Sequence, residues 1–313
     1  MSRIHEALKR AEQERAASQG GPAQPSFASP AGGEPVTTQE SPFAPGAGPS
    51  DGGSPFNSAP PSFAGPVRLD ASLVRCPQLQ WKPDAKTMLF FNDDGALGTE
   101  EFRTLRSRLY HVREKMPLKK ILVTSALPKE GKSFTAANLA QVMMRQDARR
   151  VLLIDADLRG PRLDVMLGTT SSPGLSDYLR GENDEFSIMQ RGPAENLFFI
   201  PSGGKISNPA ELVANGRLKF LLQRVEGLFD WIIIDSPPAV PVSDAGVLAK
   251  ACDGVLMVVR SNATPVDMAR RARQEFSDQA LVGVVLNGTD REAIPYTRYY
   301  YEAYEKNGAE SKS

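Results

Sequence analysis

Residues 120–140 have the sequence KILVTSALPKEGKSFTAANLA, which is the most informative segment of the chain. The apolar run at 120–124 predicts a short strand, and residues 132–144 have the pattern of a helix. Between them lies the loop Ala126-x4-Gly131-Lys132-Ser133. A strand, a Gly-Lys-Ser loop and the start of a helix, in this order, predict a P-loop that holds the phosphates of a nucleoside triphosphate. The strand and helix on either side argue against the alternative, a loop that only turns the chain.

The residue types of this loop suit a bound triphosphate and its magnesium ion. Gly131 lets the backbone approach the phosphates, and the loop N–H groups and the helix N-terminus supply positive potential. Lys132 can reach the β- and γ-phosphates, and the hydroxyl of Ser133 can bind Mg²⁺. We therefore predict that a nucleoside triphosphate binds here with Mg²⁺; the family resemblance described below implies that it is ATP. The predicted ATP contacts are Ala126, Pro128, Lys129, Glu130, Gly131, Lys132, Ser133 and Phe134.

Apolar runs and helical patterns alternate along residues 83–290, which we predict to form the P-loop domain. Further strands are predicted at 151–154, 196–200, 231–234, 255–259 and 282–286, and helices at 218–229 and 266–276. Runs of Val, Ile and Leu between helices are typical of a parallel sheet that is buried on both faces. The predicted fold class is α/β: a doubly wound, mostly parallel sheet of the P-loop NTPase type, with its ligand site at the carboxyl ends of the strands.

Three aspartates follow two of the predicted strands. Asp155 and Asp157 come directly after the strand at 151–154, and Asp235 comes after the strand at 231–234. Since the carboxyl ends of parallel strands meet at one edge of a sheet, we expect these carboxylates beside the P-loop. A magnesium–phosphate cluster needs hard oxygen ligands, so the predicted metal ligands are Ser133, Asp157 and Asp235. Any one of the aspartates could instead cap a helix or form a turn.

The segments on either side of this domain differ from it in composition. Residues 1–18 are predicted to form an amphipathic helix, and two roles stay open for it, a partner-binding segment or a frayed terminus. Residues 19–82 are rich in Pro, Gly and Ser and are predicted to be a disordered linker. Residues 291–313 form a tail that is rich in tyrosine.

The overall composition excludes several classes of function. Lys and Arg together number 37, as do Asp and Glu, so no net charge favours binding to nucleic acid or to an anionic membrane. Cys76 and Cys252 have no Cys or His neighbour at a metal-ligand spacing, which argues against a disulfide framework and a zinc site. No apolar run reaches the length of a membrane span. We expect a cytoplasmic protein that meets a membrane only through a partner.

The P-loop and the two acidic strand ends together resemble the bacterial tyrosine kinases (BY-kinases), the CpsD/CapB-like and Wzc-like cytoplasmic kinases of capsule and exopolysaccharide assembly. The resemblance covers about residues 95–304. Residues 126–133 are similar to the Walker A motif of the family, residues 152–159 to its Walker A′ motif, and residues 232–235 to its Walker B motif. Gly160 departs from the family, which often has a second arginine there, and Asp164 replaces a common histidine.

Two further features resemble elements of that family. Glu100, Arg103 and Arg106 match an E-x2-R-x2-R element, which in the family lies in a helix at the interface of ring-like oligomers. By spacing alone, these side chains could equally belong to a solvated helix face. The family also autophosphorylates a C-terminal tyrosine cluster, which here would be Tyr296, Tyr299, Tyr300, Tyr301 and Tyr304. The alternative for the tail is one packed helical stripe of Tyr296, Tyr300 and Tyr304.

The resemblance implies an ATP-dependent, autophosphorylating protein-tyrosine kinase that regulates exopolysaccharide or capsule polymerisation and export. A tyrosine hydroxyl titrates at about pH 10, so it needs a proton acceptor, for which Asp155 is the candidate. Lys132, Asp157 and Asp235 complete the predicted catalytic set, and Asn287 is predicted to contact the nucleotide base. The implied partners are further copies of this chain, protein substrates with tyrosine, and a membrane polysaccharide co-polymerase that recruits the kinase to the inner face of the membrane.

Two other functions are compatible with the same motifs. A MinD/ParA-like positioning ATPase would share the fold and the three Walker segments, but such proteins have a lysine directly after the first P-loop residue, where this chain has Leu127. A subunit of an assembly could also bind ATP without catalysis and act as a structural switch. Tyrosine phosphorylation of the purified protein with Mg²⁺ and ATP would separate a kinase from both alternatives.

Overall fold

The structure is a computed structural model that describes residues 71–90, 98–146, 149–276 and 279–289. The predicted helix at 1–18, most of the predicted linker and the tyrosine-rich tail at 291–313 lie outside the described residues. In the described ranges, no helix has both the length and the apolar character that a membrane span requires.

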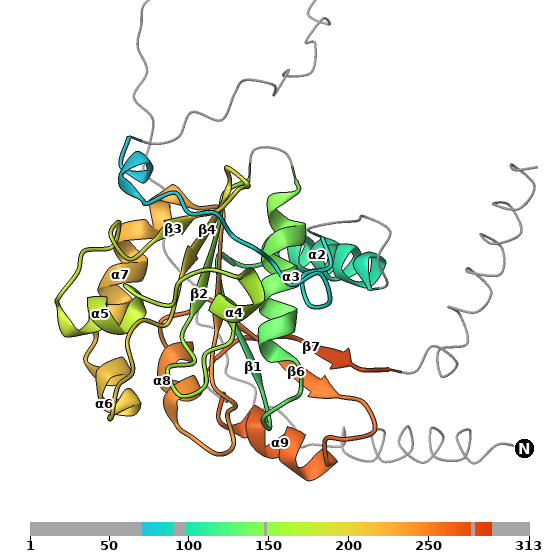
Figure 1. The fold of residues 1–313 in the computed structure, drawn as a ribbon. Coiled ribbons are helices and arrows are strands. Elements are labelled where there is room, and N and C mark those ends of the chain that lie inside the picture. The colour runs from blue at the N-terminus through green and yellow to red at the C-terminus, as the bar shows by residue number, and fades with distance from the viewer. Residues whose placement is uncertain (1–70, 91–97, 147–148, 277–278, 290–313) are drawn as a thin grey trace, which may run out of the picture. The chain divides into compact units, whose positions relative to one another are not determined.

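A seven-stranded sheet forms the centre of the described chain, with the strand order β3-β4-β2-β5-β1-β6-β7 (Figure 1). Neighbouring strands are parallel, except that β3 is antiparallel to β4. The strands are β1 (Lys120–Ser125), β2 (Val151–Asp155), β3 (Gln190–Arg191), β4 (Leu197–Ile200), β5 (Trp231–Asp235), β6 (Gly254–Arg260) and β7 (Leu281–Asn287). The predicted fold class, a mostly parallel α/β sheet, is confirmed.

Helices cover both faces of the sheet (Figure 1). The α-helices are α2 (Thr99–Arg113), α3 (Lys132–Met144), α4 (Leu163–Leu167), α5 (Leu175–Arg180), α6 (Pro209–Ala214), α7 (Arg217–Val225), α8 (Asp244–Ala249) and α9 (Val266–Gln274). Two short 3₁₀ helices, η1 (Leu73–Arg75) and η2 (Glu226–Leu228), accompany them.

The alternation of side chains along each strand produces two separate hydrophobic cores. In β1, Ile121 and Val123 pack in the core that contains α3, whereas Leu122 packs in the opposite core, to which α7 and α8 contribute. Because both cores are apolar, a buried strand needs apolar residues at every position. This is why the strands of this chain are continuous Val, Ile and Leu runs instead of alternating patterns.

The predicted strands are found within about one residue of their predicted ends, and α3 has the predicted bounds. The helix predicted at 218–229 ends at Val225 and continues as the 3₁₀ turn η2. The short helices α4, α5, α6 and α8 and the two-residue strand β3 were not predicted, because segments of this length carry no measurable periodicity.

The predicted linker boundary at residue 82 needs a correction, because residues 71–82 pack against the domain. Leu73, Cys76 and Trp81 are buried, and the Trp81 ring meets Phe199 of β4 edge to face. The backbone N–H of Leu79 also donates to the carbonyl of Arg191 in β3, at 2.9 Å. Three separated apolar residues in a Pro-rich context have no period, so the sequence pattern does not reveal this packing.

The helix α2 is attached to the domain by a polar contact inside an apolar interface. The indole Nε1 of Trp231, which is fully buried in β5, donates to the hydroxyl of Tyr110 at 3.0 Å, and the two rings meet edge to face. Arg106 adds a second contact, since its Nη1 donates to the carbonyl of Val142 in α3 at 3.0 Å.

Replacing Tyr110 with Phe should lower the free energy of unfolding by about 1–3 kcal/mol, because the buried indole N–H of Trp231 loses its acceptor. Urea titration monitored by tryptophan fluorescence measures this loss. His111→Gln is the control on an exposed position of the same helix and should stay within about 0.5 kcal/mol of the wild type. Equal stabilities of Tyr110→Phe and wild-type protein would contradict the assigned role of the hydroxyl.

Candidate functional site

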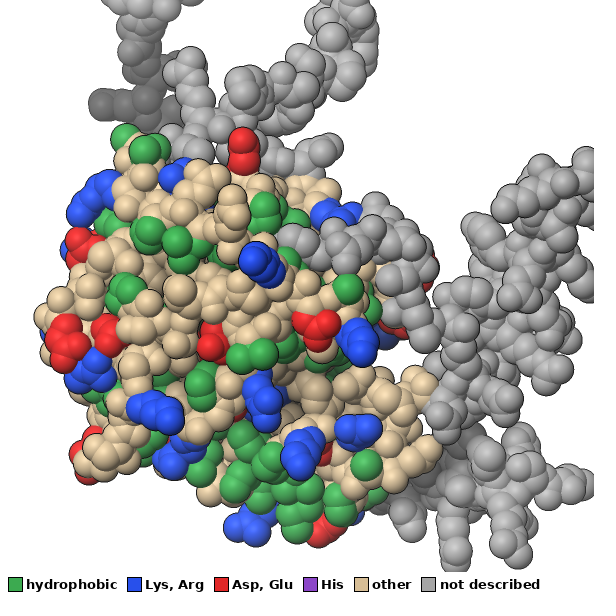
Figure 2. Space-filling model, in the orientation of Figure 1, with side chains coloured by type: hydrophobic (Ala, Val, Ile, Leu, Met, Phe, Trp, Pro, Cys, Tyr) green, Lys and Arg blue, Asp and Glu red, His purple; other side chains and the backbone are tan. Residues whose placement is uncertain are grey.

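The carboxyl ends of β1, β2 and β5 form the candidate site, at the lower edge of the sheet in Figure 1. The strand β5 lies between β1 and β2, so Asp235 is paired in register with Asp155 on one side and with Val123 on the other. The P-loop follows β1 directly. Lys and Arg side chains are more frequent than acidic ones around this edge (Figure 2), which suits a site for an anion.

Two residues of the P-loop have backbone conformations that shape the phosphate-binding turn. Lys129 has a φ of 66°, and Gly131 has a φ of 96°, in the left-handed region that favours glycine. A Cβ atom on Gly131 would lie 2.0 Å from Nδ2 of Asn287. The conformation therefore favours glycine, and a larger residue would also displace the Asn287 side chain.

The P-loop is held in place by residues at the ends of β6 and β7. The Asn287 side chain donates from Nδ2 to the carbonyl of Glu130 at 2.9 Å, and Arg260 donates from Nη1 to the carbonyl of Lys129 at 3.1 Å. The hydroxyl of Thr264 donates to the Glu130 carboxylate, which also accepts the N–H of Leu127 at 2.9 Å. Sequence reasoning missed Arg260 and Thr264, because no motif connects them to the loop.

Three of the residues that we predicted to contact ATP have side chains engaged elsewhere in this structure. Glu130 is buried and uses both carboxylate oxygens within the protein, and the Asn287 amide bonds the loop backbone. The ring of Phe134 packs edge to face on Phe102 of α2. Pro128 and Lys129 are exposed on the loop, whereas Ala126 is fully buried beneath it.

Lys132 lies among the three aspartates. Its Nζ is 2.6 Å from Oδ2 of Asp157, 3.8 Å from Oδ1 of Asp235 and 3.3 Å from the hydroxyl oxygen of Ser133. Burial alone would lower the pKa of Lys132, but attraction by the carboxylates of Asp235, Asp157 and Asp155 outweighs it and raises that pKa. The lysine is thus held as a cation in the place where phosphate charge is expected.

Asp155 lies deeper than Asp157 and is fully buried. Its Oδ1 accepts the N–H of Asp157 at 3.2 Å, and its Oδ2 accepts the N–H groups of Arg162 and Leu163 at the start of α4. Burial, together with the neighbouring Asp235 carboxylate, raises the pKa of Asp155. Burial likewise raises the pKa of Asp235, although Lys132 opposes the shift.

Of the residues predicted to bind Mg²⁺, Asp235 has free oxygen atoms that fit such an ion, whereas both carboxylate oxygens of Asp157 accept hydrogen bonds. Both carboxylate oxygens of Asp235 are buried and have no hydrogen-bond partner. Ser133 lies in the first turn of α3, and hydroxyl and carboxylate oxygens are the ligands that Mg²⁺ prefers. Within the described ranges, no three His, Cys, Asp or Glu side chains are arranged to hold a metal ion by themselves. Phosphate oxygens of a nucleotide would have to complete the coordination.

The other predicted site residues are outside this cluster. Glu100 and Arg103 form an ion pair on α2, and Arg106 bonds α3 as described above. The five tail tyrosines lie outside the described residues.

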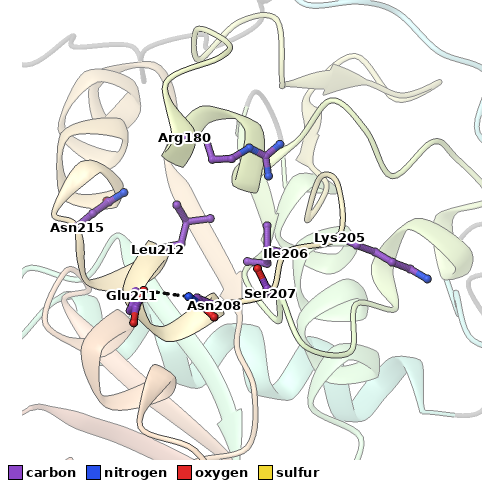
Figure 3. A pocket seen from close by; sticks show the side chains of 8 residues that line it. All are labelled: Arg180, Lys205, Ile206, Ser207, Asn208, Glu211, Leu212 and Asn215. Atoms are coloured by element: carbon purple, nitrogen blue, oxygen red, sulfur yellow. Dashed lines mark hydrogen bonds between the residues drawn. The ribbon is translucent and has the colours of Figure 1, made fainter.

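A separate surface cavity of about 460 Å³ lies between α5 and α6 (Figure 3). The guanidinium of Arg180 at its rim is already paired with Asp177 and Glu182, and Asn208 donates to Glu211 at 3.2 Å. These polar groups satisfy one another, and the residues of the P-loop and the three aspartates do not line the cavity. It is therefore a weaker candidate for the functional site.

The sequence of this chain is similar to those of several known proteins. The model of an AAA domain family matches residues 119–267. The tyrosine-protein kinase YwqD of Bacillus subtilis is 31% identical over 224 residues, which cover 71% of this chain and 93% of YwqD. The tyrosine-protein kinase wzc of Salmonella typhimurium is 33% identical over 67% of this chain, which spans only 29% of wzc.

A solved structure gives the same result at the level of the fold. The kinase domain of the Escherichia coli tyrosine kinase ETK superposes with a TM-score of 0.60 at 29% identity, over 62% of this chain and 77% of that domain. Together with the match along nearly the whole of YwqD, this establishes that the chain belongs to the bacterial tyrosine kinase family.

Proposed function

We propose that this chain uses ATP and Mg²⁺ to phosphorylate protein tyrosines, including those of its own tail. The observation that carries the proposal is the position of Lys132 at the mouth of the P-loop, against the carboxylates of Asp157 and Asp235. The acceptors in this proposal are the tail residues Tyr296, Tyr299, Tyr300, Tyr301 and Tyr304.

The residues of the site have separate roles in this proposal. Ser133, Asp157 and Asp235 would hold Mg²⁺, which would neutralise charge on the bound phosphates. Lys132 exchanges its contact with Asp157 for one with the β- and γ-phosphates when the nucleotide binds. The N–H groups of the P-loop donate to the phosphate oxygens and stabilise the negative charge that develops during transfer.

The proton of the acceptor tyrosine needs a base, and Asp155 is the proposed one. Its raised pKa makes it a stronger base than an ordinary carboxylate. In this structure Asp155 cannot yet take a proton from a substrate, because both of its buried oxygens accept backbone N–H groups. The proposal therefore requires the N–H groups of Arg162 and Leu163 to release Oδ2 when the substrate binds.

We also propose a role in the regulation of exopolysaccharide or capsule polymerisation and export. In this role the chain forms a homo-oligomer through the Glu100, Arg103 and Arg106 face of α2. A membrane polysaccharide co-polymerase would recruit it to the inner face of the cytoplasmic membrane. The support is kinship with the tyrosine-protein kinases wzc and CpsD.

Lys132→Met should abolish tyrosine phosphorylation, because it removes the cation that binds the transferring phosphate. Mass spectrometry of the purified protein after incubation with Mg²⁺ and ATP measures the product. The control is a variant in which all five tail tyrosines are replaced by Phe. It should lose phosphorylation of the tail but still phosphorylate an added tyrosine peptide. Tail labelling that survives Lys132→Met would exclude the proposed mechanism.

Lys132→Met should also destabilise the nucleotide-free protein, by up to about 3–5 kcal/mol at pH 8, because buried carboxylates lose their counter-charge. A carboxylate whose pKa is higher in the folded than in the unfolded chain lowers the stability of the fold only at pH values at which the unfolded chain would ionise it. The loss should therefore shrink as the pH falls from 8 toward 4. Urea unfolding at several pH values tests this.

The control is Lys129→Met, at an exposed position of the same loop. It should lower the free energy of unfolding by less than about 0.5 kcal/mol.

Asp155→Asn should lower kcat for tyrosine phosphorylation by about 10²–10⁴-fold if this carboxylate takes the proton. The KM for ATP should change little, because Asp155 is neither a proposed metal ligand nor a proposed contact of the nucleotide. Steady-state kinetics with an added tyrosine peptide separates the two constants. A near-normal kcat would assign the proton to another acceptor.

A further inference from the structure

Two sets of contacts fix the orientation of the Asp157 carboxylate. Its Oδ2 accepts from Lys132 at 2.6 Å, while its Oδ1 accepts the N–H groups of Arg159 at 3.3 Å and Gly160 at 3.0 Å. These two N–H groups belong to the turn that follows β2. The position of that turn therefore decides where the carboxylate points.

The turn is itself anchored by the side chain of Arg159. The guanidinium makes two parallel bonds with Asp244, from Nε to Oδ2 at 2.8 Å and from Nη2 to Oδ1 at 3.0 Å. Such a bidentate pair fixes orientation as well as distance. Asp244 is the first residue of α8 and is only 2% exposed, so it is a rigid anchor.

This ion pair connects the segments that carry the two proposed metal-binding carboxylates. Arg159 follows β2 by way of Asp157, and Asp244 follows β5, whose last residue is Asp235. Strand pairing reaches one residue past β2, where the N–H of Ala156 donates to the carbonyl of Asp235 at 2.9 Å. Asp157 lies beyond that bond, and the Arg159–Asp244 pair is a second connection between the two segments there.

We propose that Arg159 and Asp244 form a positioning pair, which places the Asp157 carboxylate for a Mg²⁺ ion shared with Asp235. The inference rests on the proposed function, because it concerns the same metal site. Arg159 in this arrangement does not contact the nucleotide, since its guanidinium is committed to Asp244.

A purely structural ion pair is the competing explanation, and single substitutions do not separate the two. Arg159→Gln would leave the Asp244 carboxylate buried without a partner, and such a loss is strongly destabilising whatever the pair does for Asp157. The double variant Arg159→Gln with Asp244→Asn removes both charges, so no unpaired charge remains. Its melting temperature should be near that of the wild type.

The experiment measures the dissociation constant of a fluorescent ATP analogue by titration of the full chain, once with Mg²⁺ and once with EDTA. The ratio of the two constants reports how much the metal ion strengthens binding, without any need for catalysis. In the double variant, the EDTA value should be unchanged and the ratio should fall by about 10- to 100-fold, the usual effect of losing an outer partner of a metal ligand. Arg159→Lys, which keeps a charge but cannot make two parallel bonds, should give an intermediate ratio.

Arg224 and Glu185 supply the matched control, because they form another ion pair in which the carboxylate is buried and the arginine is exposed. The double variant Arg224→Gln with Glu185→Gln should keep the wild-type ratio. A wild-type ratio in both Arg159 variants would overturn the positioning role. Failure of the proposed function would look different, since Mg²⁺ would then fail to strengthen nucleotide binding even in the wild-type protein.

Discussion

Charge balance at the carboxyl edge of the sheet is the constraint on which the rest of the site depends. Asp155, Asp157 and Asp235 are all buried there, and buried carboxylates persist only when they are paired or hydrogen-bonded. Lys132 supplies the counter-charge from the first turn of α3, and backbone N–H groups after β2 bond the carboxylates of Asp155 and Asp157. Both carboxylate oxygens of Asp235 have no hydrogen-bond partner, so they are available as ligands for a cation.

The shape of the P-loop depends equally on segments that are distant in the sequence. The carbonyl groups of Lys129 and Glu130 are bonded by Arg260 and Asn287, which end β6 and β7. Both strands lie on the same side of β1 in the sheet. The conformation of the loop is therefore stabilised by that half of the sheet.

The positions of the site residues follow from strand order, whereas the directions of their side chains follow from their neighbours. Ser133 and the three aspartates were placed at one edge because parallel strands bring their carboxyl ends together, and the structure has them there. Glu130 and Asn287 belong to the same edge, but their side chains support the loop backbone. The direction of a side chain depends on which atoms surround it, and no spacing rule contains that information.

The α/β class, the P-loop and the bounds of the buried strands and of α3 could be predicted from the sequence, because hydrophobic period and loop chemistry are local properties. The strand order that sets Asp155 beside Asp235 and the packing of residues 71–82 on the domain could not, and they emerge only from the fold. The same holds for the pairing of Arg159 with Asp244. These contacts join residues far apart in the chain, and their formation depends on the register and order of strands, which local patterns do not specify.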